Sequence, residues 1–395
     1  MSNHRNGRRA DDGIVIAGGG LAAQRCAETL RRSGSDEPIR ILCAETHRPY
    51  DRPPLSKQLL AGERAGADLE FRDPAWYDAN GIDLLCGVAA SRLRPAEHQL
   101  VTADGGVLRY SRLLVATGGS PRLLTPLVGY DNVLALRTVD EALELRRRVV
   151  AGTRLAIIGA GFVGLEIAAT ARALGADVTV IEAAPAPLAG VLGETVGAWF
   201  AKLHRQHGVQ VLTRRTIARV ESQSAQARVL HLSDGSAVPV DQIVVGIGTD
   251  PEVAWLAESG VRVGRGICAD ADGRTALPDV FAAGDAAATF DASSGVYVPG
   301  SHWEAAARQA TAAARLMLGL EPPRPAAPSF WTDQYGLRIQ YVGRSAPDDA
   351  VAIDGDPDSH SFSATYTRAG CATAVLLVNR PRQLPAARAL IEKEN

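Results

Sequence analysis

Apolar residues along the chain gather in short β-branched runs that alternate with longer stretches of helical composition. Residues 14–17 form the first such run and predict a buried strand. Residues 22–33 follow with a helical pattern that Gly34 ends, and residues 39–43 form the next apolar run. A strand, a helix and a second strand in this order are typical of a βαβ unit in a parallel sheet.

The same order returns further along the chain. It comprises a strand at residues 155–158, a helix at 163–174 and a strand at 178–181. Gly18 and Gly159 mark the two turns from strand to helix, and they lie much too far apart for a solenoid repeat. The pattern therefore predicts two separate nucleotide-binding units.

Two further apolar runs and a proline-rich stretch divide the chain. Residues 113–119 and 242–248 each predict a buried strand that ends in small residues, and we interpret these strands as the crossings between the two units. An alanine-rich helix is predicted at about 304–318, and the prolines of 321–325 predict a boundary. The tail from about Pro328 has strand-like runs and ends in a short charged helix, which indicates a small third domain.

Composition and charge argue against several classes of protein. The 395 residues are 46% hydrophobic and 22% charged, and the formal net charge is -2. This composition is that of an ordinary globular protein and does not indicate a protein that binds nucleic acid or a membrane. No apolar run reaches the roughly 18 residues of a membrane-spanning helix. Residues 1–12 are polar and basic and lack the apolar stretch of a signal peptide, so we expect a disordered leader and a cytoplasmic location.

Cysteine and histidine spacings predict neither a redox motif nor a metal site. No two cysteines have C-x-x-C spacing, so we expect reduced thiols, mostly buried. His204 and His207 lie three residues apart and are expected on an exposed helix face rather than at a metal. The cysteines are Cys26, Cys43, Cys86, Cys268 and Cys371.

Both turns from strand to helix carry glycines with the spacing of a dinucleotide fingerprint. The first glycine of G-x-G-x-x-G permits a tight turn, the second lets the backbone approach a pyrophosphate, and the third lets the helix pack on the strand. The phosphates then lie at the positive end of the helix. Each turn alone is also compatible with a structural role, but two of them, each after an apolar strand, predict two bound nucleotides. The positions are Gly18, Gly20 and Ala23 in the first motif and Gly159, Gly161 and Gly164 in the second.

An acidic residue follows the second strand of each unit. Glu45 comes after the run at 39–43, and Glu182 comes after the strand at 178–181. A carboxylate there accepts both ribose hydroxyls of an adenosine and repels a 2′-phosphate. Residues 183–185 contain no arginine that would bind such a phosphate, so NADH rather than NADPH is the expected donor. A solvated surface glutamate is the alternative at each position.

Six further motifs occur in order along the chain. They are R-P-P-L-S-K ending at Lys57, A-T-G-G from Ala116, L-R-T around Arg137, G-F-V-G-L-E ending at Glu166, A-G-D ending at Asp285, and F-W-T-D-Q-Y from Phe330. With these motifs the chain from Gly13 to about Pro381 resembles the oxygenase-coupled NADH-dependent ferredoxin reductase family. The R-P-P-L-S-K and F-W-T-D-Q stretches are more specific than the glycine motifs.

The resemblance implies an α/β fold with two Rossmann-like nucleotide-binding domains in a glutathione-reductase-like architecture and a small α+β C-terminal domain. A discontinuous FAD-binding domain would comprise residues 13–120 and 247–321. The NADH-binding domain would comprise residues 121–246, and an interface domain residues 322–395.

FAD would bind to the first unit by the same resemblance. Arg52 and Lys57 would reach the pyrophosphate and the flavin, Asp285 would bond the ribityl or pyrophosphate region, and Trp303 and Trp331 would wall the isoalloxazine. The FAD-binding residues implied in this way are Gly18, Gly20, Leu21, Ala22, Glu45, Arg52, Lys57, Ala90, Ala116, Thr117, Gly118, Arg137, Gly284, Asp285, Trp303 and Trp331.

NADH would bind to the second unit, and the resemblance implies Lys57 and Glu166 as catalytic residues beside the flavin and the nicotinamide. A cation near the flavin would stabilise the anionic reduced ring, and Glu166 would neutralise that cation at rest and hold it in place. The structural alternative is that Glu166 only complements the helix dipole. The NADH-binding residues would be Gly159, Gly161, Phe162, Val163, Glu166, Glu182 and Gly248.

The predicted function is electron transfer from NADH through FAD to a [2Fe-2S] ferredoxin that serves a cytochrome P450 or a Rieske-type oxygenase. A flavin is needed because NADH gives electrons in pairs whereas the cluster takes one. With no cysteine pair to relay them, electrons must leave the flavin for an outside acceptor. The ferredoxin would bind transiently to a monomer or weak dimer.

The sequence leaves two rival functions open. One is the reduction of a small molecule such as a quinone or the ascorbate radical. The other is an NADH-sensing flavoprotein of apoptosis-inducing-factor type, although such proteins tend to carry long insertions in the third domain. Around Trp303 the chain departs from the family pattern at Ser301, His302 and Ala305.

Overall fold

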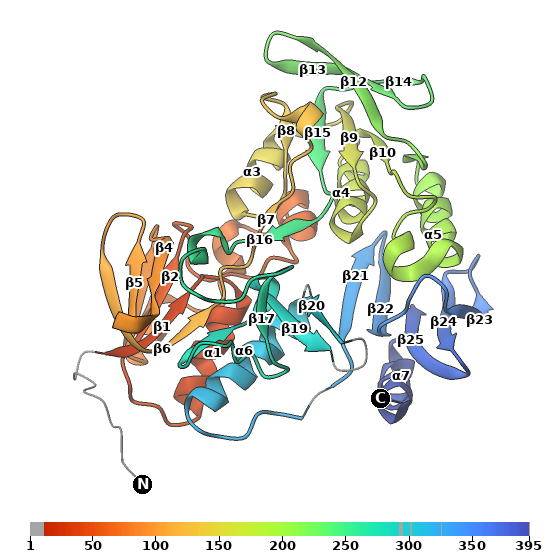
Figure 1. The fold of residues 1–395 in the computed structure, drawn as a ribbon. Helices are drawn as coiled ribbons and strands as arrows, with labels where there is room; N and C mark the ends of the chain where they lie inside the picture. Colours follow the sequence, from red (N-terminus) through yellow and green to blue (C-terminus); the bar gives the residue numbers. More distant parts are fainter. Residues whose placement is uncertain (1–11, 292–294, 301, 325, 395) are drawn as a thin grey trace. The chain divides into compact units, whose positions relative to one another are not determined.

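A computed structural model describes residues 12–291, 295–300, 302–324 and 326–394 (Figure 1). The described residues form two compact units. The leader expected at 1–12 lies outside them except for Asp12, whose carboxylate pairs with Arg109 at 2.9 Å. The first unit contains the described residues up to Asp51, Leu69–Ser120 and those from Asp250 to residue 324; the second contains Arg52–Asp68, Pro121–Thr249 and the residues from Ala326 onward.

The first unit is built on a sheet in the order β3-β2-β1-β6-β5-β4, with β18 beside β6. Strands β3, β2, β1, β6 and β18 are parallel, and β5 pairs antiparallel with its two neighbours. These strands are β1 (Gly13–Ala17), β2 (Ile39–Cys43), β3 (Ile82–Cys86), β4 (Ala90–Arg94), β5 (Gln99–Thr102), β6 (Val107–Val115) and β18 (Val280–Ala282).

Strand β1 is buried on both faces because alternate residues enter two cores. Ile14 and Ile16 pack under the helices α1 and α6, whereas Val15 packs on the opposite face. Continuous apolar sequence is what a strand covered on both faces requires. The other elements of this unit are α1 (Leu21–Arg32), α2 (Pro74–Ala79), α6 (Trp303–Met317), β17 (Ile267–Ala269), β19 (Ala287–Asp291) and β20 (Val296–Pro299).

The second unit contains a parallel sheet in the order β11-β10-β9-β15-β8 and a small antiparallel sheet, β12-β13-β14. Its nucleotide-binding part comprises β8 (Val133–Leu134), β9 (Arg154–Ile158), β10 (Asp177–Ile181), β11 (Gln210–Leu212), β12 (Ile217–Gln223), β13 (Gln226–Leu232), β14 (Ala237–Pro239), β15 (Gln242–Val245), α3 (Val139–Arg148), α4 (Phe162–Ala173) and α5 (Ala189–Gln206). Two of the passages of the chain between the units lie at β7 (Gly119–Pro121) and β16 (Thr249–Pro251).

The C-terminal sheet belongs to this same unit. Its five antiparallel strands run in the order β21-β22-β25-β24-β23, and they share a core with α4 and α5. Trp199 of α5 packs edge-on against Phe362 with ring centroids 5.1 Å apart. The elements are β21 (Ser329–Gln334), β22 (Leu337–Gly343), β23 (Ala350–Asp356), β24 (Ser361–Arg368), β25 (Cys371–Val378) and α7 (Leu384–Glu394).

Residues 52–68 also pack in the second unit, although the resemblance implies that they belong to the first. A π-helical turn, Leu55–Leu59, brings Leu60 into the core of the second unit. Thr170 of α4 donates a hydrogen bond to the Ser56 carbonyl at 2.8 Å. Leu59 and Leu60 are thus buried, and Leu60 packs against residues that lie far from it in sequence.

The fold class expected from the sequence is confirmed: the chain has two parallel α/β sheets, each with a glycine turn, and a β-rich C-terminal part. The predicted strands at 113–119 and 242–248 end earlier, at Val115 and Val245. Small residues follow each strand. Among them Gly118 and Gly248 have positive φ, +73° and +103°, so the chain turns away from the direction of the strand. Among the described residues, no helix is long and apolar enough to cross a membrane.

Candidate functional site

The first glycine cradle lies between β1 and α1. Gly18 has φ +128°, and a Cβ there would collide with the Ala116 carbonyl, so only glycine fits. Gly20 caps α1 in an extended conformation, and nothing lies within 4 Å of the position of its Cβ. The first turn of α1 contains no acidic residue. A negatively charged group can therefore approach the positive end of the helix.

Two other strand ends meet at this cradle. Because β1, β6 and β18 are parallel neighbours, their carboxyl ends lie at one edge of the sheet. Ala116, Thr117 and Gly118 follow β6, and Gly284 follows β18 with its Cβ position 3.5 Å from the Ala22 side chain. Asp285 comes next in the chain. An open parallel sheet binds ligands at such an edge.

Glu45 and Trp303 are both held by hydrogen bonds within the first unit. Glu45 follows β2, and its carboxylate accepts a hydrogen bond from the Tyr50 hydroxyl at 2.6 Å. The Trp303 indole donates to the Asp51 carboxylate at 2.7 Å. The residues implied for FAD that lie in the first unit are Gly18, Gly20, Leu21, Ala22, Glu45, Ala90, Ala116, Thr117, Gly118, Gly284, Asp285 and Trp303.

The second cradle has all three glycines in the places that the fingerprint requires. Gly159 has φ +101°, and its Cβ would lie 2.5 Å from the Gly246 carbonyl. A Cβ on Gly164 would collide with the Gly159 carbonyl. Gly161 caps α4 with φ -77°, which any residue adopts, and its Cβ position is 3.9 Å from the nearest atom. The first and third glycines are thus required by packing, whereas Gly161 leaves room for a ligand.

A pocket of about 530 Å³ opens beside this cradle. Gly159, Gly161, Glu182 and Gly248 line it. The Glu182 carboxylate accepts backbone N–H bonds from Ala160 at 2.6 Å and Ala184 at 2.8 Å. The carboxylate is thereby fixed at the end of β10, where the ribose of an adenosine would lie.

Arg215 lines the same pocket, although no motif of the sequence indicated it. The chain returns to the end of β10 there, since the Arg215 backbone N–H donates to the Glu182 carbonyl at 3.0 Å. Its guanidinium donates to Asp234 at 2.5 Å. The Ser236 hydroxyl and backbone N–H, together with Arg215, lower the pKa of Asp234 to about 2. Only the tertiary pairing of distant segments reveals this arginine.

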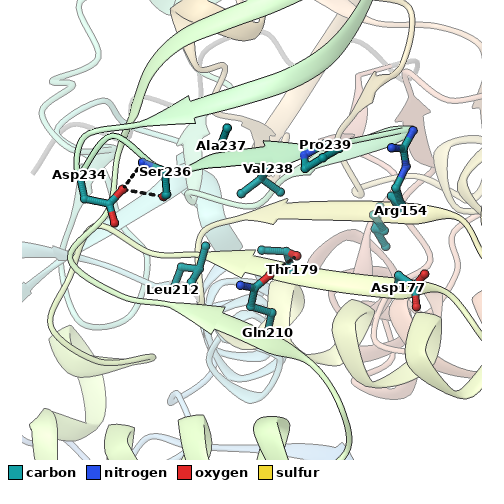
Figure 2. A pocket seen from close by; sticks show the side chains of 11 residues that line it. Arg154, Asp177, Thr179, Gln210, Leu212, Asp234, Ser236, Ala237, Val238 and Pro239 are labelled. Carbon is teal, nitrogen blue, oxygen red and sulfur yellow. Dashed lines mark hydrogen bonds between the residues drawn. The ribbon is translucent and has the colours of Figure 1, made fainter.

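Asp234 also lines a smaller pocket of about 260 Å³ between β14 and the strands β9, β10 and β11 of the parallel sheet (Figure 2). Figure 2 shows Asp234 bonded to Ser236 on one side and Arg154 and Asp177 on the other. Arg154 pairs with Asp241 at 2.6 Å. Asp234 and Arg154 are thus already bonded to neighbouring residues of the turns and strands.

Lys57 and Glu166, the residues implied for catalysis, form an ion pair within the second unit. Lys57 Nζ lies 2.9 Å from Glu166 Oε1, and the two side chains are only 13% and 8% exposed. Ser56 donates to Glu166 Oε2 at 2.5 Å, and Thr332 donates to Oε1 at 2.7 Å. Three donors from two segments therefore satisfy a buried carboxylate, as burial of a charge requires.

A chain of hydrogen bonds extends behind Glu166. Gln334 donates to the Thr332 hydroxyl at 3.1 Å, and its Oε1 lies 2.9 Å from His204 Nε2. The Tyr335 hydroxyl lies 2.8 Å from His204 Nδ1. With a neutral His204 protonated on Nε2, every donor in the chain points toward Glu166. Such aligned bonds polarise one another and fix the position of the Glu166 carboxylate.

His204 is fully buried, so the exposed helix face expected for it is wrong. The reason is that α5 packs against the C-terminal sheet, which the spacing of the two histidines does not reveal. His207 is exposed, as expected, and its ring stacks on Tyr335 with centroids 3.8 Å apart. Within the described ranges, no group of His, Cys, Asp and Glu side chains is placed to hold a metal ion.

Stability is expected to fall as acid protonates the unfolded form of His204. Burial lowers the pKa of His204 to about 4, whereas the unfolded ring titrates near 6.5. The unfolded state therefore binds more protons between these values, and the contribution of the neutral ring is lost as pH falls from about 6.5 toward 4. At pH 5 the loss is about 2 kcal/mol. Urea unfolding at pH 7 and pH 5 measures it.

The matched variant is His204→Gln, which cannot titrate in this range. Its free energy of unfolding should be lower than that of the parent at pH 7 because it loses the bond to Tyr335. The difference between variant and parent should shrink at pH 5. An identical difference at both pH values would contradict the assignment of a neutral buried ring.

The remaining implied residues also lie in the second unit. Arg52 donates to the Arg137 carbonyl, and the guanidinium of Arg338 lies 5.7 Å from the Trp331 ring. Phe162 packs edge-on against Phe330 with centroids 4.6 Å apart. The residues implied for FAD are thus divided, with Arg52, Lys57, Arg137 and Trp331 in the second unit. Of the family departures, Ser301 lies outside the described residues, His302 caps α6, and Ala305 lies within it.

Two glycine cradles on two parallel sheets, with a buried lysine–glutamate pair, define an oxidoreductase that uses two dinucleotide cofactors. Residues 12–313 match the family described as pyridine nucleotide-disulphide oxidoreductase, and residues 329–395 match the reductase C-terminal family. The chain belongs to the pyridine nucleotide-disulphide oxidoreductase family and, within it, to the ferredoxin reductases of oxygenase systems. As the resemblance implies, it is an enzyme with FAD and NADH as cofactors.

Several relatives support this assignment. The ferredoxin reductase subunit of 5,5'-dehydrodivanillate O-demethylase from Sphingobium sp. is 37% identical over 95% of this chain and 92% of its own. The reductase component of the anthranilate 1,2-dioxygenase system from Burkholderia cepacia is 37% identical over 96% and 94%. The crystal structure of a covalent putidaredoxin reductase–putidaredoxin complex matches with a TM-score of 0.94 at 33% identity, over 98% of this chain and 94% of that one.

Proposed function

We propose that the enzyme passes electrons from NADH through FAD to a [2Fe-2S] ferredoxin that serves a cytochrome P450 or a Rieske-type oxygenase. The main support is the Lys57–Glu166 pair and the serine beside it. A thiol at Ser56 would offer electrons an exit inside the protein, but the residue is a serine whose hydroxyl is bonded to Glu166. The electrons therefore pass to an outside acceptor. The names of the relatives, which include ferredoxin reductases of several oxygenase systems, support a ferredoxin.

FAD is assigned to the first cradle and NADH to the second. When bound, FAD accepts a hydride from NADH and gives up its electrons one at a time. The open position at Gly20 and the positive end of α1 would bind the pyrophosphate of FAD, and Glu45 its ribose. Gly161 and Glu182 would do the same for NADH.

We assign to Lys57 the role of a fixed positive charge that assists flavin reduction by NADH. Glu166 holds the ammonium group in one place, and Ser56 and Thr332 hold Glu166. A charge fixed in advance costs no reorganisation when negative charge develops next to it. Ser56, Thr332 and the residues behind them are positioning residues.

NADH is the proposed donor because the pocket has no unengaged cation for a 2′-phosphate among its lining residues. Glu182 would repel such a phosphate. The Arg215 guanidinium is paired with Asp234 and donates further to the Thr213 and Arg214 carbonyls. We further propose a transient ferredoxin complex, a monomer or weak dimer, and a cytoplasmic location where NADH is available.

Turnover with different acceptors tests this function. NADH oxidation should be fast with at least one ferredoxin of a purified panel, measured with cytochrome c as the final acceptor, and slower at high salt if charged patches steer the pair. NADPH should give a much lower kcat/KM than NADH. Faster turnover with a quinone or the ascorbate radical would favour the first rival function. Slow flavin reduction with a long-lived charge-transfer band would favour the NADH-sensing one.

A further inference from the structure

Two cysteines that lie far apart in sequence are neighbours beneath the first glycine cradle. Cys43 ends β2 and Cys86 ends β3, and the two residues are in register across these parallel strands. Neighbouring strands lie about 4.8 Å apart, which is within the range of about 4.4–6.8 Å between the Cα atoms of a disulfide. Side chains in register point to the same face of the sheet. The two side chains therefore lie on one face of the sheet at a backbone separation that a disulfide can span.

The two thiols differ in accessibility and reactivity. Cys43 is buried with only 1% of its surface exposed, whereas Cys86 is half-buried. The Cys86 sulfur lies 3.7 Å from the His47 carbonyl. A hydrogen bond from the Cys43 thiol, with Arg48 and His47 nearby, lowers the pKa of Cys86 to about 7. Cys86 is therefore the reactive thiol and Cys43 the resolving one.

Cys43 also touches the loop that we assign to the FAD pyrophosphate. Gly19 lies between the two fingerprint glycines Gly18 and Gly20. A Cβ on Gly19 would lie 2.5 Å from Cys43 Sγ, so the sulfur packs directly against the loop of the first cradle. The carbonyl of Cys43 accepts the Val88 N–H at 2.9 Å, and Glu45 follows two residues later. A movement of this sulfur toward Cys86 would remove the support of the loop.

We propose that Cys43 and Cys86 form a peroxide-sensitive thiol pair whose oxidation to a disulfide weakens FAD binding. The Cys86 thiolate attacks hydrogen peroxide, so that an S–O bond forms, the O–O bond breaks and hydroxide leaves. The Cys43 thiol then attacks the sulfenic sulfur, an S–S bond forms, and water is released. The two thiols lose two electrons in total, and the peroxide gains them. The link to FAD rests on the proposed function of the first cradle.

The experiment treats the FAD-loaded protein with stoichiometric hydrogen peroxide in a Cys371→Ser background, because Cys371 is the exposed cysteine. Peptide mapping should find a Cys43–Cys86 disulfide, and FAD release should be roughly tenfold faster, a change that corresponds to about 1.4 kcal/mol. Dithiothreitol should restore the original rate. Cys86→Ser and Cys43→Ala should each abolish both effects, whereas Cys268→Ser, at another buried cysteine, should leave them unchanged.

The outcomes separate this inference from the proposed function. If no Cys43–Cys86 disulfide forms while ferredoxin reduction proceeds normally, the thiol pair is refuted and the reductase function stands. If the disulfide forms but FAD release is unchanged, the coupling to the cradle is refuted. Loss of ferredoxin reduction in the untreated protein would contradict the proposed function alone.

Discussion

Gly20→Val is expected to give a folded protein without bound FAD, and Gly161→Val a yellow protein that NADH no longer reduces. Both glycines cap a helix with an extended backbone that valine adopts, and neither has a neighbouring atom that a Cβ would strike. The larger side chain instead occupies the space through which a pyrophosphate would reach the helix end. Each variant should therefore lose one cofactor and keep the other.

The measurements are the visible spectrum of the purified proteins and the apparent Kd for NADH. Gly161→Val should raise that Kd at least about 100-fold, or about 2.7 kcal/mol. Both variants should keep their far-ultraviolet spectra, because exchanging a helix cap costs roughly 1 kcal/mol. The two variants control for each other. A Gly20→Val protein that retains FAD, or a Gly161→Val protein that loses it, would reverse or refute the assignment of the cradles.

Lys57→Met is expected to slow flavin reduction by NADH about 100-fold while FAD stays bound, since loss of one preorganised charge contact costs about two orders of magnitude. Glu166 keeps its bonds from Ser56 and Thr332 in this variant, so its carboxylate stays satisfied and the fold should survive. Stopped-flow absorbance of the flavin under anaerobic conditions measures the rate.

Two further variants sharpen this test. Glu166→Gln leaves a buried ammonium without its partner, so it should lower both stability and rate, and adding Lys57→Met should restore the stability but not the rate. Lys202→Met is the matched control, because Lys202 pairs with Asp358 at 2.6 Å but is 54% exposed. A surface pair contributes little. An unchanged flavin reduction rate in Lys57→Met would show that Lys57 and Glu166 have no catalytic role.

The two cradles could be predicted from sequence because their signals are local. Gly18 and Gly159 each come directly after an apolar strand, and each has a positive φ that favours glycine. The strand-end acids Glu45 and Glu182 follow from the same short-range pattern. Helix α4 differs from the predicted span by a single residue at each end.

Features that depend on tertiary pairing could not be predicted in this way. Arg215 reaches the pocket because the chain returns to the end of β10, and His204 is buried because the C-terminal sheet covers α5. Cys43 and Cys86 become neighbours only through the pairing of β2 with β3. In each case the two segments lie far apart in sequence, and no periodic pattern of residues indicates that they meet in the fold.

The lysine–glutamate pair is an intermediate case. The resemblance implied that Lys57 and Glu166 act together, and the structure places them 2.9 Å apart. Neither the sequence nor the resemblance indicated that Ser56, Thr332, Gln334 and His204 support the carboxylate. These residues come from three segments that meet only in the folded second unit.

The most direct test of the whole account is the stoichiometry of anaerobic electron transfer. One equivalent of NADH is added to the FAD-loaded enzyme with an excess of oxidised [2Fe-2S] ferredoxin, and the absorbance of the cluster is followed. We predict that two ferredoxins are reduced for each NADH consumed, because the flavin takes electrons in a pair and releases them singly. NADH that reduces the flavin while every ferredoxin tested stays oxidised would contradict the account.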